Sequence, residues 1–166
     1  TACFGKWHLG MDMMTRDGHG LAERDSVVDQ RAYRADIDWR APIRNGPLST
    51  GFDEFYGISA SLDMHPYIWI HDNHFVGECT TEQDLLFNTR DTMPNDHGKN
   101  LGPSHADFVA EDVQGEITRK TVDFISRQSH ETPFFACMAL AAPHIPIVPS
   151  KAYQGLSELG PYGDFC

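Results

Sequence analysis

The sequence predicts an α/β fold built around a parallel sheet, and three features of the 166-residue chain lead to that prediction. Residues 1–8 form a short apolar run that passes into a polar motif bracketed by glycines. Residues 112–129 carry apolar side chains at helical spacing. Residues 134–142 are then almost continuously apolar, which is typical of a strand covered on both faces of a parallel sheet. A helix, a short loop and a buried strand together make half of a βαβ unit.

The first third of the chain is expected to hold one clear strand and much loop. Residues 1–8 predict a short buried strand that ends in a loop. Residues 11–50 are polar and rich in Asp, Arg and Gly, so we expect mostly loop, with the alternating residues 36–39 as a short strand. Residues 51–58 place three aromatic side chains between glycines, and we expect them to plug an edge of the core.

The middle and the end of the chain give stronger signals. Residues 67–76 predict a β-hairpin, because Asp72 and Asn73 are good turn residues between two β-favouring runs. Residues 88–106 form a Gly/Pro/Asn/His-rich loop, and its length suggests a functional surface. The helix over 112–129 is expected to bury the face that carries Val113, Ile117, Thr121, Phe124 and Ile125.

The composition indicates one globular domain of acidic character. Hydrophobic residues make up 40% of the chain, and no apolar run approaches the length of a membrane span. The formal net charge is −11, from 13 basic and 24 acidic residues. This charge argues against a general binder of nucleic acid or of anionic membranes. A local cationic pocket on an acidic protein can still bind an anion.

The chain has four cysteines, none in CxxC spacing: Cys3, Cys79, Cys137 and Cys166. Cys3 and Cys137 lie in apolar runs, so we expect buried free thiols there. The chain starts inside an apolar run without an initiator methionine and ends without a polar tail. We therefore expect an internal piece of a longer protein. No targeting signal marks a compartment.

The first candidate for chemistry is the motif Gly-Lys-Trp-His-Leu-Gly at 5–10. In an extended segment Lys6 and His8 would lie on the same side, while Trp7 would anchor the segment in the core. The pair could be surface residues at a strand end, metal ligands, or a clamp for an anion. The flanking glycines favour the anion clamp, because they let a ligand approach the backbone closely.

The second candidate is Ala-Pro-His-Ile-Pro at 142–146, where two prolines restrict the backbone on both sides of His144. A packed histidine and a functional histidine both fit this setting, and a position after a buried strand supports the functional one. His71, His74 and Cys79 suggest either a zinc site or a solvated hairpin tip, and the lack of a second ligand pair favours the tip. The remaining histidines suggest no site: His19, His65, His97, His105 and His130.

These motifs resemble signatures of the sulfatase family, arylsulfatase-like enzymes of the alkaline-phosphatase-like superfamily. Residues 5–10 resemble its second signature, and residues 51–57 resemble its Gly-Phe-Asp-x-Phe-x-Gly segment. Residues 133–135 and 142–146 resemble its strand that ends in Pro-His-x-Pro. Order and spacing agree over essentially the whole chain. The resemblance implies the central part of an alkaline-phosphatase-like fold, with a mostly parallel sheet flanked by helices, as an internal segment (1–166) of one catalytic domain.

The resemblance also implies roles for particular residues. Lys6, His8 and His144 would be catalytic residues that contact the sulfate ester, and Ser61 falls where some members place a polar active-site residue. The family uses a divalent cation, usually calcium, and a formylglycine nucleophile made from the cysteine of Cys-x-Pro-x-Arg. No cysteine of this chain begins that pattern, so we expect the nucleophile and the metal ligands outside the chain. The chain alone is then expected to be inactive.

Three interpretations of the parent protein stay open. The leading one is a sulfatase that acts on an aryl or carbohydrate sulfate ester, with a sulfated saccharide among its candidate substrates. A phosphatase or phosphonate hydrolase of the same superfamily could use the same cationic pocket. A non-catalytic protein that binds sulfated glycans could keep the pocket after losing the nucleophile. For compartment, the resemblance suggests the periplasm, the secreted pool or the lysosome.

Overall fold

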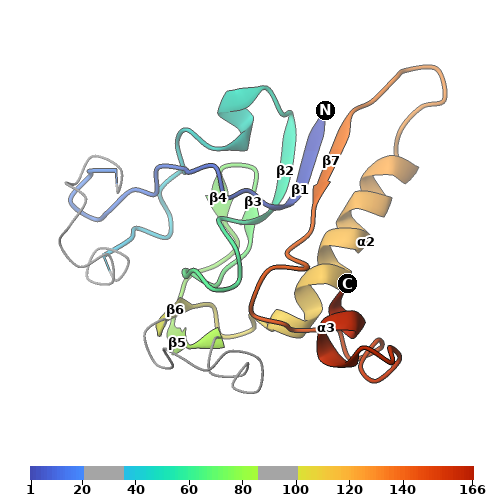
Figure 1. Ribbon diagram of the computed structural model, residues 1–166. Coiled ribbons are helices and arrows are strands. Elements are labelled where there is room, and N and C mark those ends of the chain that lie inside the picture. Colours follow the sequence, from blue (N-terminus) through green and yellow to red (C-terminus); the bar gives the residue numbers. More distant parts are fainter. Residues whose placement is uncertain (21–35, 86–100) are drawn as a thin grey trace.

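The structure, a computed structural model, describes residues 1–20, 36–85 and 101–166. Its main feature is a five-stranded sheet of order β4-β3-β2-β1-β7, with the long helix α2 (Val113–Ser126) packed against one face (Figure 1). The α/β character is confirmed. The sheet is mixed, however, because two of its strand pairs are parallel and two are antiparallel. The expectation of a mostly parallel sheet is wrong, since a hairpin extends the sheet beyond β2.

Three neighbouring strands of the sheet run parallel. β1 (Ala2–Lys6) pairs with β2 (Glu54–Ile58) on one side and with β7 (Ala136–Ala139) on the other. The strand predicted within 1–8 is therefore confirmed. Because the three strands point the same way, their carboxyl ends lie at the same edge of the sheet, at the lower end of these strands in Figure 1.

Residues 51–58 do not plug a core edge, as the sequence suggested, but contribute β2 to the middle of the sheet. Its aromatic side chains alternate between the two faces, with Phe55 in one hydrophobic cluster and Tyr56 in the other. The glycine after them, Gly57, permits a very close approach: a Cβ there would overlap the carbonyl oxygen of Gly5. Gly5 has φ +112°, and a Cβ on it would overlap the carbonyl oxygen of Ala139.

The predicted hairpin over 67–76 is confirmed. β3 (Ile70–His71) and β4 (His74–Phe75) pair in antiparallel fashion, and Asp72 in the turn has φ +56°. The short strand expected at 36–39 is wrong, because this stretch makes only an isolated bridge between Ile37 and Thr15. Among the described residues, its alternating pattern meets no neighbouring strand that could extend the ladder.

Helix α2 confirms the helix predicted within 112–129, and it buries most of the expected face. Val113 and Ile117 are fully buried and pack with Phe4 of β1 in the cluster between helix and sheet. The phenyl rings of Phe4 and Phe124 lie 5.6 Å apart. Ile125, expected on the same face, is 45% exposed because it lies at the border of the buried stripe. No helix of the described residues is long and apolar enough to cross a membrane.

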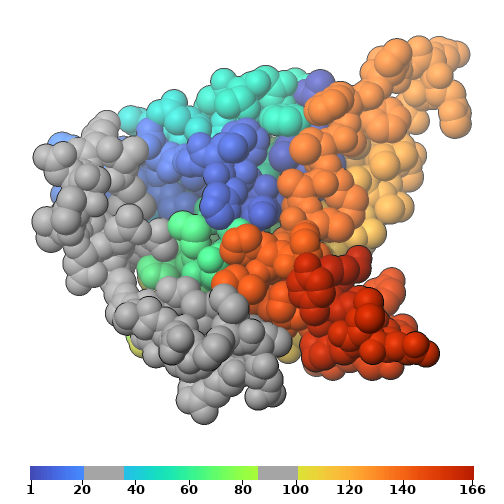
Figure 2. Space-filling view, in the orientation of Figure 1, coloured from blue at the N-terminus to red at the C-terminus, as the bar shows by residue number. Residues whose placement is uncertain are grey.

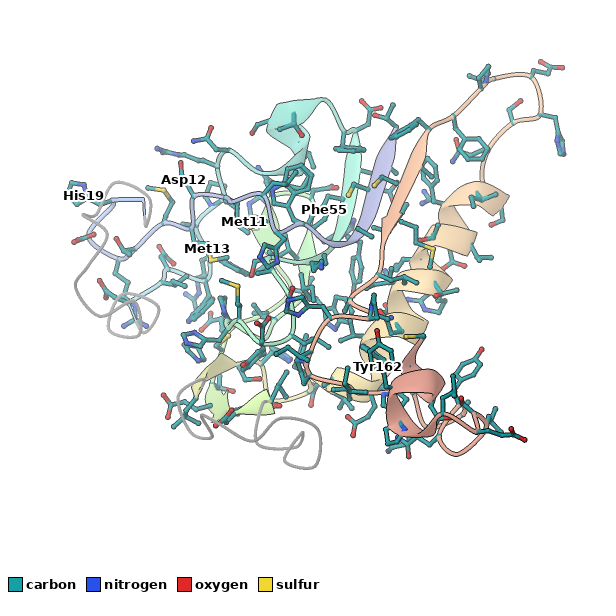
Figure 3. The ribbon with its side chains drawn as sticks, viewed as in Figure 1. Met11, Asp12, Met13, His19, Phe55 and Tyr162 are labelled. Carbon is teal, nitrogen blue, oxygen red and sulfur yellow. The ribbon has the colours of Figure 1, made fainter. Side chains whose placement is uncertain are left out.

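A second hydrophobic cluster covers the opposite face of the sheet. It joins Cys3 of β1 and Phe55 of β2 to Met13, and Met11 packs against it. In Figure 3 the segment with Met11 and Met13 leads away from Phe55 toward the loop that carries His19. Loop segments therefore cover this face where the sequence resemblance implied helices.

β7 lies at the edge of the sheet, and its exposure differs from the prediction for 134–142. Four apolar side chains of this run are exposed by 38–59%: Phe134, Phe135, Met138 and Leu140. Helix α2 covers one side of the strand, and no described strand pairs with its outer edge. The expectation of cover on both faces is therefore wrong for these residues.

Several short elements gave no signal in the sequence. β5 (Thr81–Gln83) and β6 (Gly102–Ser104) form a separate two-stranded sheet. Part of the loop expected over 88–106 is therefore a strand. Residues 88–100 of that loop lie outside the described residues. The others are the 3-10 helices η2 (Pro47–Thr50) and η4 (Ala110–Asp112) and the terminal helix α3 (Gly160–Phe165).

Candidate functional site

The parallel strands bring the sequence motifs to one edge of the sheet. Lys6 is the last residue of β1, the segment 59–63 follows β2, and the motif 142–146 follows β7. Figure 2 shows the amino-terminal segment, in blue, beside the segment around β7, in orange. Residues far apart in the chain thus meet where ligands of α/β proteins commonly bind.

Backbone hydrogen bonds fix the first motif against the end of β2. The Trp7 amide donates to the Ile58 carbonyl over 3.1 Å, and the His8 amide donates to the Ser59 carbonyl over 3.0 Å. His8 has φ +56°, so the chain leaves the extended conformation there. The simple expectation that Lys6 and His8 share one side of an extended segment does not hold, because the strand geometry ends between them.

Trp7 anchors the motif, as the sequence predicted. Its indole Nε1–H donates to the Gly10 carbonyl over 2.8 Å. The ring meets Phe52 and Phe55 edge to face, at centroid distances of 6.2 and 6.4 Å. These contacts stiffen the segment on both sides of His8, because aromatic pairs in this geometry are mutually attractive.

The imidazole of His8 is oriented by Ser61, which is 1% exposed. The backbone amide of Ser61 donates to Nδ1 of His8 over 3.3 Å, and the Ser61 Oγ lies 3.0 Å from the same nitrogen. An amide N–H can only donate, so Nδ1 must present its lone pair and the ring proton must sit on Nε2. His8 itself is exposed, and Nε2–H is left to donate to an anionic ligand.

Lys6 supplies a fixed positive charge at the same edge. Its side chain is partly buried, and it makes no hydrogen bond or ion pair within the part of the chain that the structure describes. An ammonium group keeps three donors available in this state. The arrangement offers an anion one cation and one neutral imidazole donor from a single short segment.

His144 lies in the turn after β7 and is exposed. Its backbone amide donates to the Ala141 carbonyl over 3.1 Å, and its Nδ1 lies 2.7 Å from the Ile145 carbonyl. A carbonyl can only accept, so Nδ1 carries a proton and Nε2 is the nitrogen that can exchange one with a ligand. A carboxylate oxygen of Asp63 lies 3.8 Å from the same Nδ1.

Asp63 is the site residue that sequence reasoning missed. It lies two residues after Ser61 on the loop that follows β2, so one short loop contacts His8 through Ser61 and His144 through Asp63. The sequence offered one signal for Asp63, its position two residues after the candidate Ser61. The sequence could not place its carboxylate beside His144, because that contact spans 81 residues of chain.

The β3–β4 hairpin, which carries His71 and His74, lies at the other end of the sheet. The Asp72 amide in its turn donates to the carbonyl of Phe55, near the amino end of β2. His71 and His74 face each other across β3 and β4, and Cys79 lies outside the hairpin. In residues 1–20, 36–85 and 101–166 no three His, Cys, Asp or Glu side chains could hold a metal. That the calcium ligands lie elsewhere in the protein stays a prediction.

The other histidines do not join the site. His65 is buried beneath Gly102, and His105 lies against Gly77. His19 and His130 lie in loops, and His97 falls outside the described residues.

Comparison with known proteins places the chain beside sulfatases. It is 25% identical to an N-acetylgalactosamine-6-O-sulfatase of Bacteroides thetaiotaomicron, over 99% of this chain and 33% of that protein. It is 32% identical to human N-acetylgalactosamine-6-sulfatase, over 71% of this chain and 20% of the human protein. No family model matches the chain.

A solved structure shares the fold. It is a sulfatase from a Bacteroides thetaiotaomicron locus for the metabolism of multiple glycosaminoglycans, with a TM-score of 0.65 and 24% identity over 99% of this chain and 36% of that one. The chain thus spans about a third of its bacterial relative and a fifth of its human relative. It is homologous to a segment of N-acetylgalactosamine-6-sulfatases.

Proposed function

We propose that the protein carrying this chain is a sulfatase that hydrolyses the 6-O-sulfate ester of N-acetylgalactosamine, and that this chain supplies part of the sulfate-binding pocket. The proposal is supported by the strand order, which puts the segments that carry Lys6, His8 and His144 after the carboxyl ends of adjacent parallel strands. The names of the sulfatase relatives support the carbohydrate substrate.

The chemistry of ester cleavage suits these side chains. When the S–O bond breaks, negative charge stays on the sulfuryl oxygens and builds on the leaving alcohol oxygen. The Lys6 ammonium, which no other described group neutralises, would bind the sulfuryl oxygens. The Nε2–H of His8, directed by the Ser61 amide, would donate a hydrogen bond to the same group. Preorganised donors of this kind each lower the barrier by about 2.7–4 kcal/mol.

His144 is proposed to handle the proton of the leaving group. Its Nδ1–H is held by the Ile145 carbonyl, and a carboxylate oxygen of Asp63 lies 3.8 Å from the same nitrogen. A protonated Nε2 could then donate to the departing sugar oxygen, which is the role of a general acid.

Two parts of the reaction are proposed to come from outside residues 1–166. The family resemblance suggests a formylglycine nucleophile and a divalent cation, usually calcium. A bound cation would polarise the sulfuryl oxygens when present. The residues of this chain would bind and orient the ester and move the proton.

The test is an activity assay on the protein at its full natural length. N-acetylgalactosamine 6-sulfate should be hydrolysed, and the 6-phosphate should be a much poorer substrate. Lys6→Ala should lower kcat/KM about 10²–10³-fold, because it removes a charge made for the transition state. Lys151→Ala changes an exposed lysine outside the motifs 5–10 and 142–146; it is the matched control and should leave kcat/KM unchanged.

Three outcomes would contradict the proposal. Preferred hydrolysis of the phosphate would make the protein a phosphatase. Binding of the sulfated sugar without release of sulfate would make it a binding protein. Equal values of kcat/KM for Lys6→Ala and Lys151→Ala would remove Lys6 from the site.

A further inference from the structure

Two cysteines that the proposed function does not use lie side by side in the sheet. Cys3 of β1 and Cys137 of β7 are register partners in a parallel pair of strands. Side chains of register partners project from the same face of a sheet. Neighbouring strands lie about 4.7–4.9 Å apart, and disulfides join Cα atoms about 4.4–6.8 Å apart. The backbone spacing therefore falls inside the range that a disulfide spans.

The two side chains also share one environment. Cys3 belongs to the hydrophobic cluster on the sheet face away from α2, and Cys137 packs against that cluster. The neighbouring thiol of Cys137 contributes to the raised pKa of Cys3, and both thiols are free. Cys3 is 2% exposed, whereas Cys137 is only partly buried. A reagent would reach Cys137 first.

We propose that Cys3 and Cys137 form a dithiol site, which a low-molecular-weight disulfide such as oxidised glutathione converts into a reversible cross-link between β1 and β7. The proposal is independent of the sulfatase activity, because it rests on the strand register and the burial of the two thiols.

The reaction balances as two thiol–disulfide exchanges. The thiolate of Cys137 attacks one sulfur of oxidised glutathione, forms a mixed disulfide and releases one glutathione thiolate. The thiolate of Cys3 then attacks Sγ of Cys137 and releases the second glutathione thiolate. The protons of the two cysteines end on the two released thiolates, and the oxidant takes up two electrons.

The second exchange should be the slower one. Burial, together with the neighbouring Cys137, raises the pKa of the Cys3 thiol to about 12. Only the thiolate is nucleophilic, and far below the pKa its fraction rises about tenfold for each pH unit. Closure of the cross-link should therefore quicken about tenfold per unit between about pH 7 and about pH 9.

The cross-link would act close to the candidate site. Cys3 lies three positions before Lys6 on β1, and Cys137 lies on the strand that leads to His144. Joining them would tie the two strands that carry these motifs. Oxidation would thus restrict the motion of the two strand ends relative to each other without modifying a proposed ligand-binding side chain.

Peptide mapping of the full-length protein tests the proposal. The reduced protein is incubated with oxidised glutathione, alkylated, and digested with trypsin without reduction. We expect the peptide that ends at Lys6 to be linked to the peptide 128–151, which carries Cys137. Cys79 and Cys166 serve as internal controls and should stay outside this linkage. Recovery of Cys3 and Cys137 as separate alkylated peptides, or linkage of Cys3 to Cys79, would overturn the proposal.

Two variants test the order of attack. In Cys3→Ser, the mixed disulfide of Cys137 with glutathione cannot be resolved, so it should accumulate. In Cys137→Ser, the buried Cys3 should stay a free thiol. Glutathione on Cys3 but not on Cys137 would contradict the proposed order. The mapping of the unaltered protein decides the linkage itself even if either variant fails to fold.

Discussion

The close contact between β1 and β2 makes Gly57 a sharp test of how the sheet is built. A methyl group at this position would overlap the carbonyl oxygen of Gly5, which is backbone and cannot rotate away. The strands would have to separate at their carboxyl ends. We therefore expect Gly57→Ala to destabilise the protein strongly.

The structure supplies the size of the effect. Separation at this point would strain the two hydrogen bonds just beyond it, from Trp7 to Ile58 and from His8 to Ser59. Each contributes about 0.5–1.5 kcal/mol. Overpacking adds about 1–3 kcal/mol. The free energy of unfolding should fall by about 2–6 kcal/mol in total.

Urea unfolding followed by tryptophan fluorescence measures this change. Gly115→Ala is the matched control, because a Cβ there meets no atom within 4 Å and the residue lies inside α2. Alanine in a helix interior should raise stability by about 0.5–1 kcal/mol. If both variants shifted the free energy of unfolding in the same direction, the argument from backbone overlap would be refuted.

Three further predictions concern separate features. Ser61→Ala keeps the backbone hydrogen bond to His8 but loses the hydroxyl. The kcat/KM of the proposed sulfatase should therefore fall only about 2- to 13-fold. A loss as large as that of Lys6→Ala would contradict the supporting role of the hydroxyl. Ile117→Ala, at a fully buried position, should cost about 2–5 kcal/mol in urea unfolding, whereas Ile125→Ala at an exposed position should stay within about 0.5 kcal/mol. The backbone N–H groups of Gly155 and Ser157 donate to the Asp164 carboxylate over 2.7 Å and lower its pKa. The contribution of Asp164 to stability is therefore present above its pKa in the unfolded chain and is lost as pH falls through its lower pKa in the folded protein. Asp164→Asn should flatten the decline in the free energy of unfolding below about pH 4.

Local pattern was sufficient for the elements whose signals lie within a few residues. The helical spacing in 112–129 and the turn residues Asp72 and Asn73 predicted α2 and the β3–β4 hairpin. The polar motifs after apolar runs also predicted strand ends. Two such ends meet because β1 and β7 are parallel neighbours.

Features set by distant neighbours could not be predicted in the same way. Residues 51–58 form a strand because they pair with β1, about 50 positions earlier in the chain. The apolar run at 134–142 does not itself tell an edge strand from a central one. In the loop after β2, only the family resemblance pointed to Ser61. The contacts of Ser61 with His8 and of Asp63 with His144 depend on tertiary packing, which the local sequence does not specify.

The geometry of the sheet and the candidate site are linked through the same two hydrogen bonds. These bonds hold His8 beside the loop that carries Ser61, and they lie directly beyond the contact at Gly57. A change at Gly57 should therefore disturb the site even in molecules that stay folded. Ile117→Ala removes a comparable free energy of unfolding from the core between α2 and the sheet, but it adds no atoms at the contact between β1 and β2. At a temperature where both variants are folded, kcat/KM of the proposed sulfatase should fall in Gly57→Ala and stay near the original value in Ile117→Ala. Equal activity in the two variants would mean that the spacing of β1 and β2 does not position His8.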